Sequence, residues 1–517
     1  MIIVLDFGGQ YCHLIARRIR DLGVYSEIFP FNIKLETLKN QQPEAIIFSG
    51  GPRSVYERDS PNLKKEVFQY ILKKKVPILG ICYGFHLIVN NLGGKIVSKK
   101  LKEYGRTKLE IIKPNFLLAS LAPTETVWMS HGDQVKNLPP DFEILAKTEI
   151  CPIASYANHD KHIYGVQFHP EVKNTPKGQT ILENFTFKIA HCKKEWKLKN
   201  WIEESIQEIK EKIGNEDRVI LGLSGGVDSS VTAVLLHRAI GDRLHCIFVN
   251  NGLLRKNEEN EVQNVFKGQL GFKNFHFLNA EGNFLENLKD IDEPEEKRRI
   301  IGHTFIKVFE KKTLDLEKEF PNIKYLAQGT IYPDRVETAA TSKATAKIKS
   351  HHNVTLPDEM KLELIEPLKD LYKDEVRKIG LELGLSKEIV YRHPFPGPGL
   401  AVRCLGPIDK NKLNILKDAD KILLEEIEQA NLYDKLWQIF CVLIPVKTVG
   451  VMGDYRTYEY ICSIRAVESV DAMTASFAKL DWDLLERIGT RIINEVKGFN
   501  RVVYDISNKP PSTIEYE

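Results

Sequence analysis

The sequence predicts an α/β fold: two open, mainly parallel-sheet α/β domains followed by a smaller α+β C-terminal domain. Three observations predict it. Short apolar segments alternate with amphipathic helical segments over the first part of the chain, and the same alternation begins again near residue 218. After a run of Pro and Gly, longer strands and helices follow one another without that alternation. We expect domains at 1–195, 196–392 and 393–517.

The first domain should contain a buried parallel sheet. Its expected strands are short and apolar, namely Ile2–Asp6, Ala45–Ser49 and Val76–Ile81. Between them, Gln10–Leu22 and Asn62–Lys75 carry apolar residues at helical spacing and predict crossover helices. In an open sheet of this kind, functional groups collect at the C-terminal ends of the strands.

A charged helical connector at 191–215 leads to the second sheet. Arg218–Leu223 is an apolar strand, and the helical segment after it runs to Ile240. Strands at His245–Asn250 and Tyr325–Gln328 continue the pattern. The second domain therefore repeats the strand–helix alternation of the first.

Two irregular segments follow. Residues 330–352 are rich in Thr, Ser, Ala and Lys and predict a loop, and the Pro-Gly run 393–399 cannot hold a helix or a central strand. The third domain then combines helices near 410–430 and 482–497 with strands Ile439–Val446, Tyr458–Ile464 and Arg501–Ile506.

Composition argues against several classes of function. Lys and Arg number 73 and Asp and Glu 70, so the net charge of +3 gives no basis for binding nucleic acid or an anionic membrane. None of the eight cysteines stands in C-x-x-C spacing, so neither a zinc site nor a disulfide framework is indicated. The N-terminal apolar run is too short for a signal peptide, and no stretch approaches the roughly 20 apolar residues of a membrane helix. We expect a cytoplasmic protein.

The motif Gly80-Ile-Cys82-Tyr-Gly84 stands where a predicted strand ends and a helix begins. A G-x-C-x-G motif at such a junction is a nucleophile elbow with sulfur as the nucleophile. The glycines tolerate the tight backbone, and the helix N-terminus favours the thiolate. An isolated buried cysteine is more often a small hydrophobic residue, so a catalytic role needs partners.

His169-Pro-Glu171, at the end of another predicted strand, supplies those partners. Pro170 favours extended backbone at His169, and side chains two apart on an extended segment face the same way. Glu171 can then hold one tautomer of the His169 ring, and the ring can activate the Cys82 sulfur and protonate the leaving amine. The alternative is a structural histidine in a turn.

The turn Ser49-Gly50-Gly51-Pro52 closes the neighbouring strand. The backbone N–H groups of Gly51 and Tyr83 predict an oxyanion hole beside the thiol. A glycine turn alone is common, so this prediction depends on the neighbouring motif.

These residues together resemble class I glutamine amidotransferase domains. The resemblance covers roughly residues 1–190 and includes Trp128-Met-Ser-His-Gly-Asp133, a substrate-side loop in such domains. It implies that ammonia is released from L-glutamine. The family usually has Gln four positions after the nucleophile, where this chain has His86.

The second sheet begins with a strand followed by Ser224-Gly-Gly-Val-Asp-Ser-Ser230. Two glycines let backbone N–H groups surround phosphate, and the following helix N-terminus adds its dipole. Serine hydroxyls can donate to phosphate oxygens, and Asp228 can help to hold Mg²⁺. No Walker motif occurs. The loop resembles the pyrophosphate loop of enzymes that cleave ATP between its α and β phosphates, which implies ATP binding by Ser224, Gly225, Gly226, Val227, Asp228, Ser229 and Ser230.

Later motifs narrow the resemblance to the GMP synthase family and extend it over nearly the whole chain. They are Gln328–Asp334, Ile348–Asn353, Arg392–Gly399, Gly450–Tyr458 and Lys509–Glu515. The resemblance implies amination of XMP at C2: ATP adenylates the C2 oxygen, ammonia displaces AMP, and GMP and pyrophosphate result. It also implies a homodimer formed through residues after 393.

The same resemblance implies further site residues. Those in contact with XMP would be Arg298, Gln438, Asp454, Lys509 and Glu515; the two cations suit its phosphate, and Glu515 suits ribose or base. Those in a lid over the nucleotide would be Asp334, Glu337 and Lys349.

Two departures from the family pattern accompany these residues. Asn250 stands where the family usually has Asp, and Thr355 stands where it has a pair of glycines. Two other functions stay open. An NAD synthetase shares the pyrophosphate loop, although it normally pairs that loop with a nitrilase-type glutaminase. A non-enzymatic binding protein could have kept the fold without the chemistry.

Overall fold

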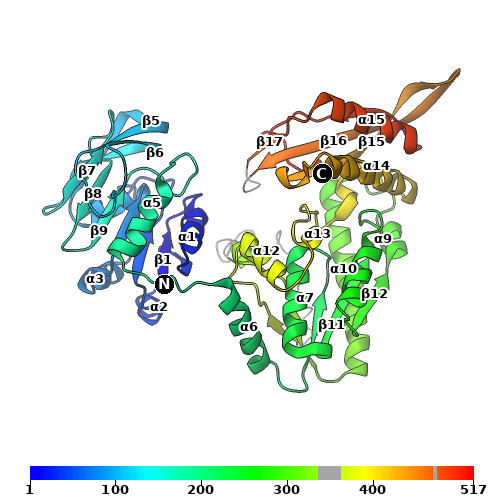
Figure 1. Cartoon of the computed structure of the whole chain (residues 1–517), viewed down its shortest axis with the longest axis horizontal. Helices are drawn as coiled ribbons and strands as arrows, with labels where there is room; N and C mark the ends of the chain where they lie inside the picture. Colours follow the sequence, from blue (N-terminus) through cyan, green and yellow to red (C-terminus); the bar gives the residue numbers. More distant parts are fainter. Residues whose placement is uncertain (336–361, 470–473) are drawn as a thin grey trace. The chain divides into compact units, whose positions relative to one another are not determined.

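A computed structural model describes residues 1–335, 362–469 and 474–517 of the chain (Figure 1). The chain divides into two compact units, Met1–Lys197 and Leu198–Glu517, which we call unit 1 and unit 2. Each unit has its own sheets and its own helices.

Unit 1 is built on a nine-stranded sheet in the order β2-β1-β3-β4-β9-β8-β7-β5-β6. The first five strands in this order are parallel, and the remaining pairs are antiparallel. The strands are β1 (Ile2–Asp6), β2 (Ser26–Pro30), β3 (Ala45–Phe48), β4 (Ile78–Ile81), β5 (Lys95–Ile111), β6 (Thr124–Asn137), β7 (Glu143–Lys147), β8 (Ser155–Asn158) and β9 (Ile163–Val166).

Helices cover both faces of the parallel part of this sheet. Apolar residues of α2, α3 and α4 share one core with Ile3, Leu5 and Phe48, whereas α1 and α5 contact each other away from it. The helices are α1 (Cys12–Asp21), α2 (Leu35–Gln41), α3 (Lys65–Lys73), α4 (Tyr83–Asn91), α5 (Gly178–Glu183) and the π-helix η1 (Asn184–Ile189).

Unit 2 begins with a five-stranded, all-parallel sheet in the order β12-β11-β10-β13-β14. Its strands are β10 (Arg218–Gly222), β11 (Leu244–Asn250), β12 (Phe275–Asn279), β13 (Ile323–Ala327) and β14 (Glu363–Ile365). The elements around it are α6 (Leu198–Lys212), α7 (Val227–Ile240), η2 (Gly241–Arg243), α8 (Glu258–Gln263), η3 (Asn264–Gln269), α9 (Glu281–Asn287), α10 (Pro294–Glu319), α12 (Lys373–Glu382) and α13 (Lys387–Val390).

A second sheet of unit 2 is mixed: β15, β16 and β17 are antiparallel, and β18 runs parallel to β16. Its elements are η4 (Gly399–Val402), α14 (Lys410–Gln429), η5 (Tyr433–Lys435), β15 (Gln438–Met452), β16 (Tyr455–Ser469), β17 (Ala475–Phe477), α15 (Trp482–Glu495) and β18 (Phe499–Tyr504). One hydrophobic core joins the two parts of unit 2, because Ile220 and Phe309 share it with Leu416 and Ile464.

The predicted fold class is confirmed. The expected strands and helices are present with ends that differ by a few residues, because helix and strand termini depend on contacts that a local pattern does not contain. The long β5–β6 hairpin was not expected. Lys95–Ile111 carries many charged residues and a register shift, so apolar alternation does not mark it as a strand.

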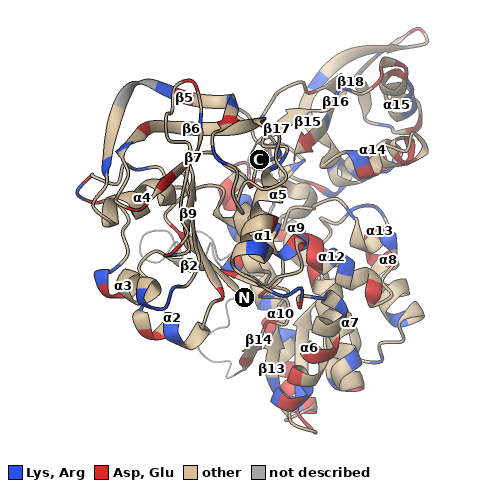
Figure 2. Cartoon of the chain, turned by 60° about the vertical axis from the view of Figure 1, so that its left-hand side comes forward, with Lys and Arg blue, Asp and Glu red and all other residues tan. Residues whose placement is uncertain are grey.

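Charges of both signs are interspersed along the helices, as Figure 2 shows for α2, α3 and α10, in keeping with the near-zero net charge. Among the helices of the described residues, none combines the length and apolar character needed to cross a bilayer.

Candidate active sites

The first candidate site begins at the junction of β4 and α4. Cys82 lies between them with φ 51° and ψ −100°, a conformation that costs about 1–3 kcal/mol in a residue with a side chain. A Cβ added to Gly80 would lie 2.7 Å from the Gly84 carbonyl oxygen, and one added to Gly84 would lie 2.4 Å from the Phe48 carbonyl oxygen. The two glycines therefore let α4 pack directly on the sheet and keep the turn sharp.

His169 and Glu171 lie just beyond the end of β9, the strand beside β4. His169 Nδ1 is 2.7 Å from Glu171 Oε1, and both side chains are almost fully buried. Burial alone disfavours the charged imidazole, but the Glu171 carboxylate and the Cys82 sulfur outweigh burial and hold the pKa of His169 well above its ordinary value. The His169 ring therefore interacts with a carboxylate on one side and with the Cys82 sulfur on the other.

β6 borders this triad. The His169 N–H donates to the Trp128 carbonyl over 3.0 Å, and the Thr175 hydroxyl donates to the His169 carbonyl over 2.6 Å. The Cys82 thiol lies 3.7 Å from the Ser130 carbonyl. The Trp128–Asp133 segment, expected on the substrate side, thus lies beside Cys82 and holds the backbone of His169.

The glycine turn after β3 faces the same histidine. A Cβ on Gly50 would lie 3.2 Å from His169 Cε1, and one on Gly51 would lie 2.7 Å from the Phe7 carbonyl oxygen. Among the described residues, the backbone N–H groups of Gly51 and Tyr83 have no hydrogen-bond partner. These two donors are therefore available to an oxyanion.

The second candidate site is the junction of β10 and α7. Gly225 has φ 78°, and the Ser224 and Ser229 hydroxyl oxygens are 2.9 Å apart. Ser229 also accepts from the Ser224 N–H over 3.2 Å, while Val227 opens the helix. The loop is held in shape by its own hydroxyls, and the first amides of α7 lack helical partners.

Asp228, in the first turn of α7, is held from one side only. Its Oδ2 pairs with the ammonium of Lys373, the first residue of α12. Its Oδ1 is buried and has no hydrogen-bond partner among the described residues, and the same holds for the Ser230 hydroxyl. The site therefore offers one cation, one unpaired carboxylate oxygen and one unpaired hydroxyl.

Two of the segments that resemble the GMP synthase family, Gln328–Asp334 and Arg392–Gly399, lie against this loop. A Cβ on Gly329 would lie 3.1 Å from the Asp228 carbonyl carbon, so the Gln328–Asp334 segment packs on the loop. Arg392 Nη1 lies beside Gly225 and donates to Glu258 Oε1 over 2.9 Å. Asp334 Oδ2 accepts from the Ile331 N–H over 3.1 Å. Glu337, Lys349 and Thr355 lie outside the described residues.

Some of the residues expected at a nucleotide are brought together in unit 2. Gln438 Nε2 donates to Glu515 Oε1 over 2.6 Å, and Arg298 donates to the backbone oxygen of Glu517. Lys509 exchanges backbone hydrogen bonds with Ala475 at the edge of the mixed sheet.

Asp454 lies elsewhere in the chain. It is exposed in the turn between β15 and β16, whereas Gln438 pairs with Val467 at the opposite end of that hairpin. At about 3.3 Å per residue the two ends are on the order of 40 Å apart. Within one chain, Asp454 and Gln438 do not line one pocket.

Comparisons with known proteins agree with this geometry. The family model "Glutamine amidotransferase class-I" matches residues 3–189, "NAD synthase" matches 196–283, and "GMP synthase C terminal domain" matches 425–516. Curated proteins named "GMP synthase [glutamine-hydrolyzing]" match the whole chain. Those of Brachyspira hyodysenteriae and Carboxydothermus hydrogenoformans are each 53% identical, and that of Aquifex aeolicus is 52% identical, over 100% of this chain and 99% of theirs. The chain belongs to the GMP synthase family.

Membership of the GMP synthase family explains the partial match to NAD synthase. That match covers the connector helix α6, the Ser224–Ser230 loop and the strands β10, β11 and β12. Of this range, the Ser224–Ser230 loop is the part that the two kinds of ligase were expected to share. The class I glutaminase match argues against the NAD synthetase alternative.

One departure from the amidotransferase pattern, His86, and one from the GMP synthase pattern, Asn250, can be examined in the structure. His86 is buried, and its Nε2 has no partner among the described residues; burial, with the nearby His131, lowers its pKa to about 4. Asn250 Oδ1 accepts from the Gly252 N–H over 2.9 Å. An aspartate would support the same turn, so this substitution preserves the local backbone.

Lys373 was missed by sequence reasoning. It lies 145 residues from its partner Asp228, so no local motif joins them. The signal that could have found it is a helix start at Tyr372, where Glu375 completes a capping box and leaves the intervening lysine in the first turn.

Proposed function

We propose that the chain catalyses the amination of XMP to GMP, with ammonia from L-glutamine and with ATP cleaved to AMP and pyrophosphate. The observation that carries this proposal is the presence, in one GMP synthase family chain, of a buried Cys82–His169–Glu171 set and a Ser224–Ser230 phosphate loop. Neither site would yield a useful product without the other. Ammonia is mostly protonated at neutral pH, and an adenylated acceptor without a nucleophile would hydrolyse.

The glutaminase steps follow from the geometry of the triad. Since Nδ1 of His169 bonds to Glu171, Nε2 is left to take the Cys82 proton. The thiolate attacks the side-chain amide carbon of glutamine, and the N–H groups of Gly51 and Tyr83 stabilise the oxyanion. His169 returns its proton to the leaving ammonia. Water then hydrolyses the thioester, which releases glutamate and restores the thiol.

The ligase steps use the phosphate loop. The XMP C2 oxygen attacks the α-phosphorus of ATP, the α–β bond breaks, and pyrophosphate leaves. The amides of Gly225 and Gly226, the loop hydroxyls and the Lys373 ammonium suit the charge that gathers on the leaving group. Ammonia then adds at C2, AMP departs with the C2 oxygen, and GMP results.

Mg²⁺ is proposed as the metal that accompanies ATP. The residues present fit it, because the buried Asp228 Oδ1 is an unpaired carboxylate oxygen, the hard ligand that Mg²⁺ prefers. When bound, the ion would neutralise negative charge on the phosphates. Asp228 would hold it while Lys373 holds the other carboxylate oxygen.

We assign XMP contacts to Arg298, Gln438, Lys509 and Glu515, and the lid to Asp334, Glu337 and Lys349. Three functional domains, 1–195, 196–392 and 393–517, are proposed within the two compact units.

A homodimer through the third domain is supported by exposed apolar side chains on the β15–β16 hairpin. Val449 and Tyr458 pair across the two strands, and Val451 lies on the same face. Their exposed fractions are 53%, 57% and 74%, which is unusual for an apolar row that solvent alone would face. Asp454, at the tip of this hairpin, would then reach XMP in the second copy.

A cytoplasmic location is proposed on the chemistry of the cysteines. All eight are buried free thiols, which a reducing compartment preserves.

The experiment that tests the function measures AMP, pyrophosphate and GMP after mixing the chain with XMP, ATP, Mg²⁺ and glutamine. We expect the three products in equal amounts. XMP binding without any AMP release would overturn the proposal and favour a binding protein. Release of AMP without GMP, with ammonium salt as well as with glutamine, would contradict the amination step.

A further inference from the structure

The segment from Asp505 to Glu517 follows β18 and contains no regular helix or strand, yet it is held tightly. Three fully buried cations contact it: Lys297 of α10, Arg403 after η4 and Arg465 of β16. A buried cation is costly unless it is paired, so each of these ion pairs constrains the segment.

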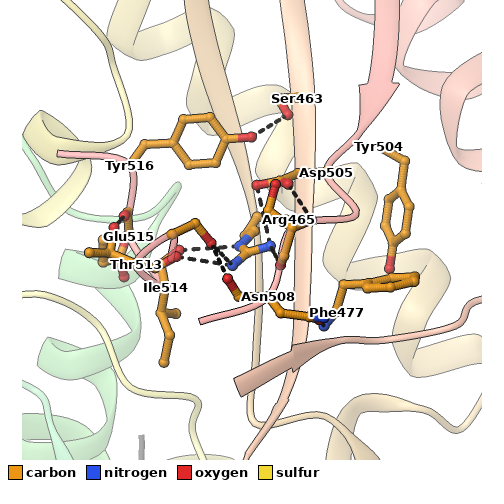
Figure 3. A network of polar contacts seen from close by, with 12 residues as sticks. Ser463, Arg465, Phe477, Tyr504, Asp505, Asn508, Thr513, Ile514, Glu515 and Tyr516 are labelled. Atoms are coloured by element: carbon orange, nitrogen blue, oxygen red, sulfur yellow. Dashed lines mark hydrogen bonds and ion pairs between the residues drawn. The ribbon is translucent and has the colours of Figure 1, made fainter. Parts of the chain in front are cut away.

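Arg465 anchors the first part of the segment, as Figure 3 shows. Its guanidinium donates to the carbonyls of Ser507 over 2.6 Å and Thr513 over 3.0 Å, and it pairs with Asp505 at 3.3 Å. A further contact reaches the Ser512 hydroxyl. These acceptors lie up to eight residues apart in sequence, so one arginine folds the segment back on itself.

Side chains beyond this anchor alternate between two faces. Ile514 and Tyr516 turn to the mixed sheet: Ile514 packs in an apolar cluster with Phe440, and the Tyr516 hydroxyl is 2.9 Å from Ser463 Oγ. Glu515 and Glu517 contact buried cations instead. Each carboxylate is thus fixed by its own cation.

Glu515 makes a bidentate pair with Arg403, with Nε–Oε2 and Nη2–Oε1 distances of 3.0 and 2.9 Å. The guanidinium lies over the Phe440 ring, 4.0 Å from its centre. Such a planar fork fixes the carboxylate orientation, because two parallel hydrogen bonds leave little rotation.

Glu517 pairs with Lys297, whose side chain is 0% exposed, and its other oxygen accepts from the Gly406 N–H over 3.2 Å. Lys297 also donates to the Cys404 carbonyl over 3.1 Å and reaches the Ala401 carbonyl at 3.5 Å, which gives each ammonium proton an acceptor. Arg298, the next residue of α10, donates to the Glu517 backbone.

We propose that Glu517 and Lys297 are positioning residues: they hold Arg298 and Glu515 in place to bind the nucleoside monophosphate XMP. Arg298 is adjacent to Lys297 on α10, and Glu515 is two residues before Glu517 on the segment. The buried Lys297–Glu517 ion pair therefore joins the two elements that carry these groups assigned to XMP. This inference rests on the proposed function of Arg298 and Glu515. Glu517 itself orients the site and does not touch the substrate.

The test is Glu517→Gln, measured with ammonium salt as nitrogen donor so that glutamine hydrolysis does not limit the rate. The KM for XMP should rise about tenfold, whereas kcat at saturating XMP and the KM for ATP should change less than about twofold. An unchanged KM for XMP would overturn the inference. A wild-type chain without XMP-dependent turnover would instead overturn the proposed function.

Two further variants separate positioning from loss of stability. Glu426 is a buried carboxylate paired with the partly exposed Arg487 and Arg491 between α14 and α15, so Glu426→Gln removes a buried carboxylate charge elsewhere in unit 2. It should lower the melting temperature and leave the KM for XMP unchanged. The double variant Lys297→Met, Glu517→Gln should recover stability, because no charge is left unpaired, but should keep the raised KM. If the double variant recovered both the wild-type melting temperature and the wild-type KM for XMP, the Lys297–Glu517 pair would be purely structural.

Discussion

The nucleophile elbow and the phosphate loop are two forms of one junction, in which a buried parallel strand turns sharply into a helix. In the elbow, the positive φ falls on Cys82 itself, and the flanking glycines make room for the helix. In the loop, the positive φ falls on Gly225, and no side chain is presented there. The position of the left-handed residue thus decides whether the junction offers a side chain for covalent chemistry or backbone amides for an anion.

Removing the presented side chain should have the largest effect. Cys82→Ala should lower glutamine-dependent GMP formation by a factor on the order of 10³ or more, because no other group can form the thioester. Turnover with ammonium salt should persist, since the phosphate loop belongs to unit 2. Product analysis with each nitrogen donor measures both.

A matched control is Cys192→Ala, which removes another buried thiol of unit 1 outside the triad. It should leave both activities close to wild type. Equal loss of both activities in Cys82→Ala would contradict two separate centres.

A change in the phosphate loop should have the opposite outcome, with the ligase activity lost and the glutaminase activity retained. Asp228→Ala removes the partner of Lys373 and the unpaired oxygen assigned to Mg²⁺. XMP-dependent pyrophosphate release should fall about 10²-fold or more, because charge at the leaving group is no longer balanced. Glutamine hydrolysis, followed as glutamate release, should stay measurable. If pyrophosphate release and glutamate release fall together, the assignment of separate reactions to the two junctions is wrong.

Both junctions were predicted from sequence because each is contiguous. The residues of the elbow span five positions and those of the loop seven, and backbone geometry alone brings them together. His169 and Glu171 followed from one short segment at a strand end. Residues close together in the sequence were enough to predict these two junctions and the His169–Glu171 contact.

The groups that sequence reasoning missed are joined only by the tertiary fold. Lys373 lies 145 residues from Asp228, and Lys297 lies 220 residues from Glu517. A lone lysine in a helix has no pattern that separates a buried one from a solvated one. The separation of Asp454 from Gln438 was hidden for the same reason, since the length of the β15–β16 hairpin depends on pairing across it.

Glycine substitutions in the elbow and in the loop should differ in their effect on the free energy of unfolding. A Cβ at position 84 would lie 2.4 Å from a backbone oxygen, so Gly84→Ala should lower the free energy of unfolding of unit 1 by roughly 2–3 kcal/mol. Gly226 has φ −75°, and a Cβ there would lie 3.3 Å from Ser224 Oγ, so Gly226→Ala should cost under about 1 kcal/mol. Calorimetric unfolding of the two variants measures both effects. A larger loss for Gly226→Ala than for Gly84→Ala would contradict the view that the elbow glycines provide space.

The smallest expected effect concerns His86, which follows the elbow and differs from His169 in its electrostatics. Burial, with the nearby His131, lowers the pKa of His86 to about 4, whereas the ordinary value in an unfolded chain is about 6.5. Below that ordinary value the unfolded state binds a proton that the folded state refuses, so stability is lost as pH falls from about 6.5 towards 4. At about 1.36 kcal/mol per pKa unit, the loss between pH 6.5 and 5 is roughly 1–2 kcal/mol.

His86→Gln removes this titration and should flatten the acid side of the stability curve by that amount. His169 contributes in the opposite direction, because its pKa is raised and its ion pair is fully present at low pH. The comparison of the two proteins cancels that contribution, since His169 and Glu171 are unchanged in the variant. Denaturant unfolding at pH 5 and pH 7 measures the difference, and parallel pH dependences would show that His86 keeps its proton affinity despite its burial beside the elbow.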